Sequence, residues 1–273
     1  MTIPDSVTSL GEGAFKNCSA LKSITIPDSV TAIGQHAFLQ CAALTGVTLP
    51  KGITSIEEGT FLFCTALKNM TIPGSVTDIK KSAFYSCKAL KSVTIPGSVT
   101  SIGENAFMDC TGLTGVTLSE GVVEIGSYAF FNCTGLTSVK IPAGVTKIGS
   151  YAFSNCTALT SVTIPSSVTA IEDNAFYECT ALTAVTIPGS VETIGSYAFA
   201  LCDCLKNVTI SDGVTSIGEA AFVYCGKLKN VTIPGSVSEI GDFAFFDSPC
   251  KITVPRGSYA EQYCKENELT YGN

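Results

Sequence analysis

The sequence predicts a single α/β solenoid made of eleven stacked coils of 23 residues. One phenylalanine recurs at this spacing without an insertion. Its positions are Phe15, Phe38, Phe61, Phe84, Phe107, Phe130, Phe153, Phe176, Phe199, Phe222 and Phe245. Between successive phenylalanines the chain repeats variants of V-T-I-P-x-S-V-T-x-I-G-x-x-A-F-x-x-C-x-x-L-x-x. A fixed period of this length is typical of arrays in which each coil buries its apolar face against its neighbours.

Within one coil, the order of residue types predicts strand, strand and turn. Residues 90–95 alternate apolar and polar side chains and are rich in β-branched types, which indicates a short parallel strand. Pro96 ends this strand because proline has no N–H to donate to the ladder. Residues 99–102 are expected to form a second, shorter strand. Gly103 then turns the chain, and residues 104–110 are expected to form a short helical turn on the opposite face.

About eight side chains of each coil are expected to point into the core. In the fifth coil they are Val93, Ile95, Val99, Ile102, Ala106, Phe107, Cys110 and Leu113. A lone coil cannot cover these groups on both sides, so we expect folding to depend on stacking.

The two ends of the array differ. Residues 1–251 are assigned to the solenoid and residues 252–273 to a C-terminal cap of the same domain. The cap begins with a last strand, 252–255, and Ser258-x-x-Glu261 has the form of a capping box for a helix from about Tyr259 to Asn267. Residues 1–3 would be an open edge strand. We therefore expect either that the natural chain continues upstream or that this edge self-associates with another molecule.

Composition excludes several classes of protein. The chain has a net charge of −7, and its 16 basic residues are scattered, which argues against nucleic acid as a partner. No stretch of 18 apolar residues is present, so no membrane insertion is expected. No signal peptide is recognisable, because repeat sequence begins directly after Met1.

Ten of the thirteen cysteines occupy one repeat position, three residues after the core phenylalanine. They are Cys18, Cys41, Cys64, Cys87, Cys110, Cys133, Cys156, Cys179, Cys202 and Cys225. We interpret them as small core residues with free thiols, because equivalent side chains one strand apart are too distant for a disulfide and do not converge on a metal. Cys204 is interpreted as incidental. Cys250 and Cys264 lie in the cap, where a disulfide between them is possible.

No arrangement of residues points to catalysis. The single histidine, His36, has no second histidine to form a relay or a metal site, and no nucleophile elbow, phosphate loop or dinucleotide fingerprint is present. Adjacent acidic residues such as Glu57 and Glu58 are interpreted as solvated surface charge. We therefore expect no enzyme activity, no cofactor and no metal.

The repeat frame I-P-x-S-V-T-x-I-G-x-x-A-F-x-x-C-x-x-L resembles the BspA-type leucine-rich repeat, and the resemblance covers nearly the whole chain. The ending Gly257-Ser258-Tyr259-Ala260-Glu261 is similar to the segment that often closes these arrays. The resemblance implies a leucine-rich repeat array with a parallel sheet on one face and a bacterial cell-surface or secreted protein that binds a host or extracellular protein. The many free thiols suggest a reducing or anaerobic setting.

Two surfaces could bind a partner. The strand face carries an outward threonine at Thr25, Thr48, Thr71, Thr94, Thr117, Thr163, Thr186, Thr209 and Thr232, with Lys140 interrupting the row. Threonine also simply suits exposed strand positions, which is the interpretation we favour. The opposite face carries large apolar residues, which would either pack between coils or form an interaction site. The candidate contact residues there are Tyr128, Tyr151, Tyr197, Tyr85, Phe131 and Tyr177.

The sequence thus favours a non-enzymatic protein-binding or adhesion module. Two alternatives stay open. One is a structural spacer without a ligand of its own, and the other is a glycan-binding module, for which aromatic residues should line a groove.

Overall fold

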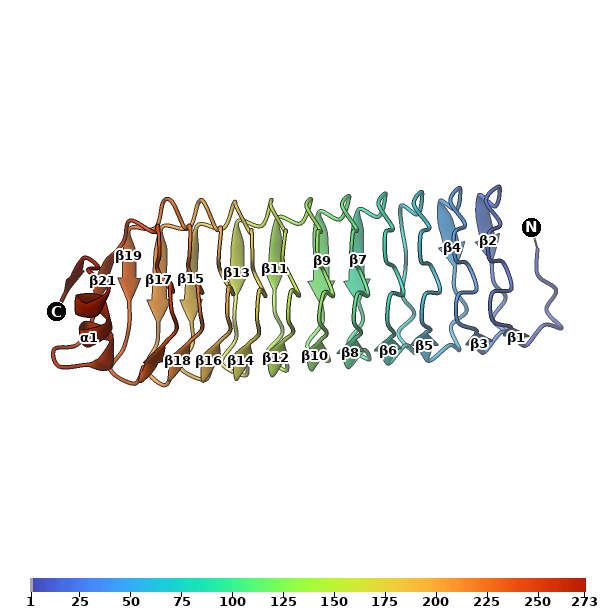
Figure 1. Ribbon diagram of the computed structural model, residues 1–273. Helices are drawn as coiled ribbons and strands as arrows, with labels where there is room; N and C mark the ends of the chain where they lie inside the picture. Colours follow the sequence, from blue (N-terminus) through green and yellow to red (C-terminus); the bar gives the residue numbers. More distant parts are fainter. Residues whose placement is uncertain (1) are drawn as a thin grey trace.

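The computed structural model of the protein describes residues 2–273, which form an elongated solenoid with the two ends of the chain at opposite ends of the rod (Figure 1). Most coils contribute two short strands, and the strands of successive coils run parallel. In the first and fourth coils, isolated bridges at Thr2 and Asn69 stand in place of the first strand. The predicted α/β solenoid with its 23-residue coils is confirmed. Met1, which belongs to the predicted open edge strand, lies outside the described residues, and Thr2 forms a parallel bridge with Thr25.

The first strands, where present, form one face of the rod, which we call the strand face. These strands are β2 (Ser23–Thr25), β4 (Gly46–Thr48), β7 (Ser92–Ile95), β9 (Gly115–Leu118), β11 (Ser138–Lys140), β13 (Ser161–Thr163), β15 (Ala184–Ile187), β17 (Asn207–Ile210), β19 (Asn230–Thr232) and β21 (Lys251–Thr253). Equivalent residues pair with each other, as Val208 does with Val231. The pairing falls into groups β2-β4, β7-β9, β11-β13 and a five-stranded group that begins at β15.

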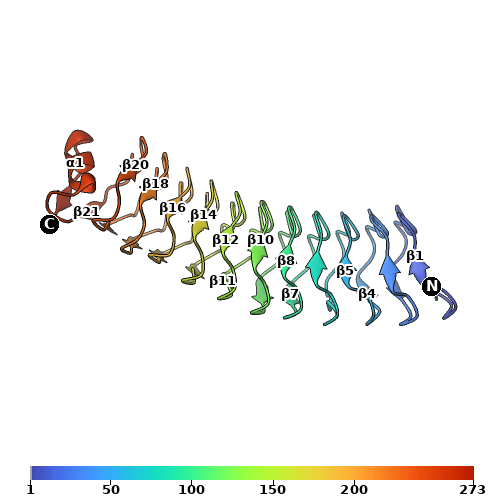
Figure 2. The same ribbon diagram turned by 90° about the horizontal axis from the view of Figure 1, so that it is seen from below.

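The second strand of each coil is two residues long. These strands are β1 (Ser9–Leu10), β3 (Ala32–Ile33), β5 (Ser55–Ile56), β6 (Asp78–Ile79), β8 (Ser101–Ile102), β10 (Glu124–Ile125), β12 (Lys147–Ile148), β14 (Ala170–Ile171), β16 (Thr193–Ile194), β18 (Ser216–Ile217) and β20 (Glu239–Ile240). From β5 to β20 they form one nine-stranded sheet that follows the length of the rod, which Figure 2 shows from below. The predicted second strand is therefore present, although shorter than residues 99–102.

The core runs unbroken along the rod. All eight side chains predicted for the fifth coil are buried, and one hydrophobic cluster joins every coil. The repeated phenylalanines form a continuous stack in which neighbouring ring centroids lie 5.0 to 5.5 Å apart. Each buried phenylalanine contributes roughly 1.5–3 kcal/mol through burial, and each stacked pair adds about 0.5–1.5 kcal/mol. Stacking of coils is therefore the dominant source of stability.

The segments expected to be short helical turns have a different local structure. Residues 104–109 form consecutive turns, and Asn105 and Asp109 adopt left-handed φ angles of 57° and 59°. The N–H of Asn105 donates to the carbonyl of Ser127 in the next coil at 3.0 Å, and the N–H of Phe107 donates to that of Ala129 at 2.8 Å. A helix would direct these N–H groups along its own axis. Hydrogen bonding between coils takes precedence and requires the left-handed residues.

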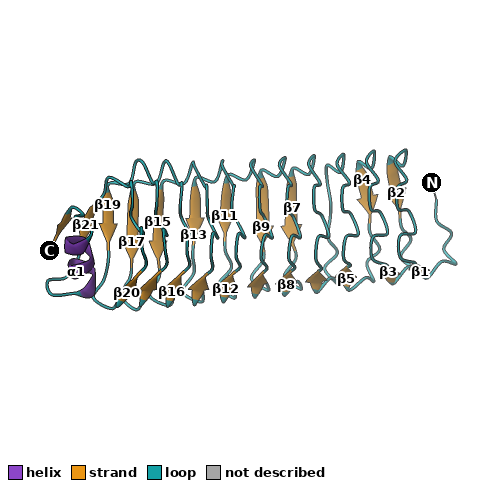
Figure 3. Cartoon of the chain, viewed as in Figure 1, coloured by secondary structure: helices purple, strands orange, loops and turns teal. Residues whose placement is uncertain are grey.

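The cap follows its prediction and adds one strand. Helix α1 (Tyr259–Glu266) is the one α-helix among residues 2–273 (Figure 3). The Ser258 hydroxyl accepts a hydrogen bond from the Glu261 N–H at 3.2 Å, and the Glu261 carboxylate accepts one from the Gly257 N–H at 2.7 Å. Strand β22 (Tyr271–Gly272), which the sequence did not reveal, pairs with β21. The Tyr263 hydroxyl donates to the Gly241 carbonyl at 3.3 Å and ties α1 to the last coil.

Candidate interaction surface on the turn face

The core thiols act as hydrogen-bond donors. In nine coils the Sγ–H group donates to the carbonyl of the phenylalanine 26 residues earlier, at 3.0 to 3.4 Å, as Cys110 does to Phe84. In the last coil Ser248 occupies the cysteine position, and its hydroxyl donates to Phe222 at 2.7 Å. Burial raises the pKa of the Cys110 and Cys156 thiols to about 12. Such thiols are not nucleophiles at neutral pH.

The remaining cysteines do not form a reactive site either. All thirteen thiols are free in the structure. Cys250 and Cys264, the pair for which a disulfide is possible, are both buried, and burial raises the pKa of each to about 11. Among residues 2–273, no cluster of three or more histidine, cysteine or acidic side chains could hold a metal ion.

The threonine row lies where the sequence placed it. Each of its members, such as Thr94, is exposed on the strand face, and Lys140 pairs with Glu120 at 3.5 Å where it interrupts the row. Within residues 2–273, the pairs of aromatic rings that contact each other outside the core belong to the turn segments and not to this face. Its composition supports the interpretation of threonine as an ordinary exposed strand residue.

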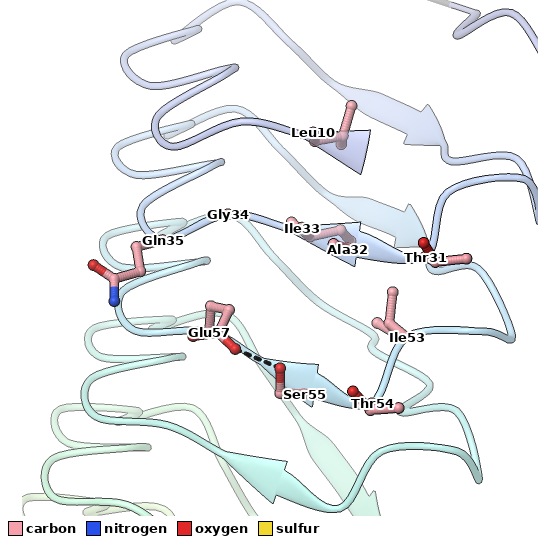
Figure 4. Close-up of a pocket in the computed structure, with 10 residues that line it drawn as sticks. All are labelled: Leu10, Thr31, Ala32, Ile33, Gly34, Gln35, Ile53, Thr54, Ser55 and Glu57. Atoms are coloured by element: carbon pink, nitrogen blue, oxygen red, sulfur yellow. Dashed lines mark hydrogen bonds between the residues drawn. The ribbon is translucent and has the colours of Figure 1, made fainter. Parts of the chain in front are cut away.

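A shallow hollow of about 300 Å³ lies where the pairing of the second strands is interrupted, between β3 and β5 (Figure 4). Thr31, Thr54 and Ser55 line it, together with the apolar residues Leu10 and Ile53. The one carboxylate drawn there, Glu57, accepts a hydrogen bond from Ser55. With a single titratable group and no positive partner, this hollow offers no constellation for catalysis.

The turn segments that carry the core phenylalanines form a second face of the rod, which we call the turn face. Five of the six predicted contact residues lie together on it. Tyr128 stacks on Tyr151 with ring centroids 4.6 Å apart, and it contacts Phe131 at 5.7 Å. Phe131 and Tyr151 also line a shallow depression of about 510 Å³ with Tyr177 and Tyr197. We call these five residues the aromatic patch.

The patch is partly open to solvent. Tyr197 is 37% exposed, and the other four rings are half-buried. Ser154, Asn155 and Asn174 line the same depression, and the Asn155 amide donates to the buried Ser154 hydroxyl at 3.2 Å. The sixth predicted residue, Tyr85, lies apart and contacts Phe63 at 5.3 Å.

Three tyrosines of the patch sit in a strained backbone conformation. The residue two positions before the core phenylalanine is left-handed in every coil, and the φ angles of Tyr128, Tyr151 and Tyr197 are 58°, 58° and 57°. Glycine or asparagine occupies this position in four of the other coils, as in Gly59 and Asn105, and the remaining four carry His36, Ser82, Ala220 and Phe243. A bulky residue in this region costs on the order of 1 kcal/mol more than glycine, whereas asparagine tolerates it.

Residues 1–114 and 123–253 match the sequence profile described as the BspA type leucine rich repeat region (6 copies). The chain belongs to the BspA-type leucine-rich repeat family. A leucine-rich cell surface protein of Faecalibacterium prausnitzii A2-165 is similar in structure, with a TM-score of 0.59 and 32% identity over 98% of this chain and 86% of that one.

Two further structures resemble this BspA-type array. A leucine-rich repeat protein of Eubacterium ventriosum has a TM-score of 0.52 and 25% identity over 88% of this chain and 73% of that one. The pneumococcal vaccine antigen PcpA has a TM-score of 0.55 and 19% identity over 99% of this chain and 78% of that one, which is a likeness of fold alone. No curated protein matches the chain significantly.

The BspA-type array also carries exposed aromatic rings that the sequence-based selection of contact residues missed. Tyr224, Phe243, Phe246 and Tyr259 lie near the cap and are 44% to 59% exposed. Phe246 makes edge-to-face contacts with Tyr224 at 5.9 Å and Phe243 at 5.8 Å. No sequence signal marks this exposure, because the left-handed turn position of Tyr224 holds a buried side chain, Ser86, in another coil. Within residues 2–273, no helix has the length and hydrophobicity needed to cross a bilayer.

Proposed function

We propose that this chain is a non-enzymatic protein-binding module of a bacterial cell-surface protein, and that the aromatic patch is its contact site. The family relationship and the similarity to the F. prausnitzii cell surface protein support the surface location. The aromatic patch supports the binding role, because aromatic rings are enriched at the centres of protein interfaces.

The strained tyrosines are the observation that carries the proposal. A residue chosen only for stability at the left-handed position would be glycine or asparagine. Tyrosine stands there in three of the four coils between residues 116 and 206, where the patch lies. Strain of this kind tends to be retained where the side chain has a function.

Replacement of the three strained tyrosines tests the proposal directly. The variant Tyr128→Asn, Tyr151→Asn, Tyr197→Asn keeps a residue that tolerates the left-handed backbone and removes three rings. A panel of purified extracellular-matrix proteins is tested for binding to the natural chain by surface plasmon resonance. We expect the variant to lose binding to those matrix proteins that the natural chain binds.

A strand-face variant provides the matched control. In Thr117→Ser, Thr163→Ser, Thr186→Ser three exposed residues of the same coils are changed, so we expect unchanged binding. Loss of binding in this control with retention in the tyrosine variant would assign the interface to the strand face. Loss of folding in the tyrosine variant, seen by circular dichroism, would make the three rings packing residues.

A glycan is a second candidate ligand, because the depression combines aromatic rings with the amides of Asn155 and Asn174. The same tyrosine variant distinguishes the two candidates when the purified proteins are enzymatically deglycosylated. Binding that survives deglycosylation supports protein recognition. Self-association through the first coil remains a prediction, which the molar mass from light scattering at increasing concentration tests.

A further inference from the structure

Within the turn segments that carry the aromatic patch, the charges are of one sign. Lys147, which pairs with Glu172, lies just outside these segments. In the six turn segments 103–111, 126–134, 149–157, 172–180, 195–203 and 218–226 there is no lysine or arginine. The segments that form and flank the depression carry Glu172, Asp173, Glu178, Asp203 and Glu219. Earlier in the array, the turn segment 80–88, which contains Tyr85, carries Lys80, Lys81 and Lys88, so the single sign belongs to the segments of the patch and not to every turn segment.

Most of these carboxylates are not neutralised within the described chain. Glu172 is paired with Lys147, and it also accepts hydrogen bonds from Ser150. Asp173 accepts only the N–H of Ser196, at 2.8 Å. Glu219 accepts the Tyr197 hydroxyl at 3.4 Å, which places a carboxylate directly against a ring of the patch.

Two tyrosine hydroxyls of the patch have raised pKa values, in part because of these negative charges. The pKa of Tyr197 is raised, chiefly by the charge of Glu219 and also by partial burial and Tyr177. The pKa of Tyr177 is raised by burial first, and then by Glu178 and Tyr151. The negative charges of Glu219 and Glu178 that contribute to these shifts favour a cation nearby, and the ring faces themselves attract cations.

We propose that the depression of the aromatic patch receives a lysine or arginine side chain of the partner protein. The rings of Tyr151, Tyr177 and Tyr197 would contact the cationic head and its aliphatic stem, and Glu178 and Glu219 would face its charge. This inference rests on the proposed function and names the chemistry of the partner, which is a basic protein segment.

Fluorescent hexa-arginine is the probe, with hexa-glutamate and a neutral glycine-serine hexapeptide as comparisons, and fluorescence anisotropy is the measurement. We expect hexa-arginine alone to bind and its affinity to fall with added salt. Tyr177→Leu keeps an apolar side chain but removes the ring, so affinity should fall about five- to tenfold. Tyr177→Phe keeps the ring and should retain binding within about twofold.

A charge-matched pair of variants separates the patch from the overall charge of the chain. Glu178→Gln, Glu219→Gln should weaken hexa-arginine binding about two- to fivefold. Glu57→Gln, Glu58→Gln removes the same charge from a distant turn and should leave binding unchanged. Equal effects of the two pairs, or equal effects of the leucine and phenylalanine variants, overturn the proposal.

Two further outcomes also overturn the proposal. Binding to phosphatidylcholine vesicles that is lost in Tyr177→Leu would assign the depression to a lipid headgroup. The triple tyrosine variant could lose binding to a matrix protein while hexa-arginine either does not bind the natural chain or binds the variant equally well. That result would support the proposed function and exclude a cationic partner.

Discussion

The thiol hydrogen bonds predict that a core cysteine is replaced better by serine than by alanine. Cys110 is fully buried, and its thiol donates to the Phe84 carbonyl at 3.1 Å. Cys110→Ala removes a buried atom of about methylene size, worth about 1 kcal/mol, and leaves a cavity of roughly 20 Å³, worth about 0.5 kcal/mol.

The lost hydrogen bond adds to this destabilisation. The Phe84 carbonyl keeps the N–H of Cys87 at 3.1 Å, so it is not left without a partner, and the missing thiol bond accounts for about 0.5–1 kcal/mol. The alanine variant should therefore lose about 2 kcal/mol of unfolding free energy. Cys110→Ser keeps the bond, as Ser248 does in the last coil, and should lose about 1 kcal/mol.

Urea unfolding followed by circular dichroism measures both values, with the slope of the transition checked for a change in cooperativity. Cys204→Ala is the control, because Cys204 is partly exposed and lies off the ladder, and it should change stability by no more than about 0.5 kcal/mol. An alanine variant as stable as the serine variant, or more so, refutes the reasoning and reduces the sulfur to an apolar filler.

Three further predictions follow from the same structure. Ellman's reagent should label only the partly exposed thiols, Cys18 and Cys204, in the native protein at pH 8, and all thirteen in denaturant; fast labelling of the ladder would contradict its burial. Tyr197→Asn should be more stable than Tyr197→Ala by about 0.5–1 kcal/mol in urea, because both remove the ring but asparagine tolerates the left-handed backbone better; equal values would show that the position carries no strain. The hydrogen bond from the Gly257 N–H lowers the pKa of Glu261. The Glu261 carboxylate therefore stabilises the cap above its ordinary pKa near 4.5, and this stabilisation is lost as pH falls through the lower pKa of the folded state. Glu261→Gln should flatten that part of the acid unfolding curve, and an unchanged curve would exclude this role.

Repetition explains why so much of the fold was predictable. A buried position such as Phe107 is read eleven times in the sequence, so its role does not depend on a single local pattern. The capping box at Ser258 was also readable, because both of its hydrogen bonds are local. Strand β22 was not, since two residues such as Tyr271 and Gly272 carry no periodicity.

The candidate surface was predictable in its residue types but not in its geometry. Spacing placed Tyr128 and Tyr151 in the same row, and the structure shows them stacked. It could not show that Tyr224 is exposed, because the same left-handed position holds the buried Ser86 in another coil. The separation of Tyr85 from the other candidates was readable from the repeat, because Met108 occupies the equivalent position in the coil between Tyr85 and Phe131.

The hydrogen-bond ladders on the two faces share one further property, which is their constant sequence offset. Backbone partners on the strand face are 23 residues apart, as Val185 and Val208 are, and thiols reach carbonyls 26 residues back throughout. Removal of 23 consecutive residues from the interior, or of a multiple of 23, would therefore rejoin each donor to an equivalent acceptor, whereas removal of any other number would misalign every ladder at the junction. The length of the rod can thus vary in whole coils, through unequal recombination or by design, without a new interface having to be found.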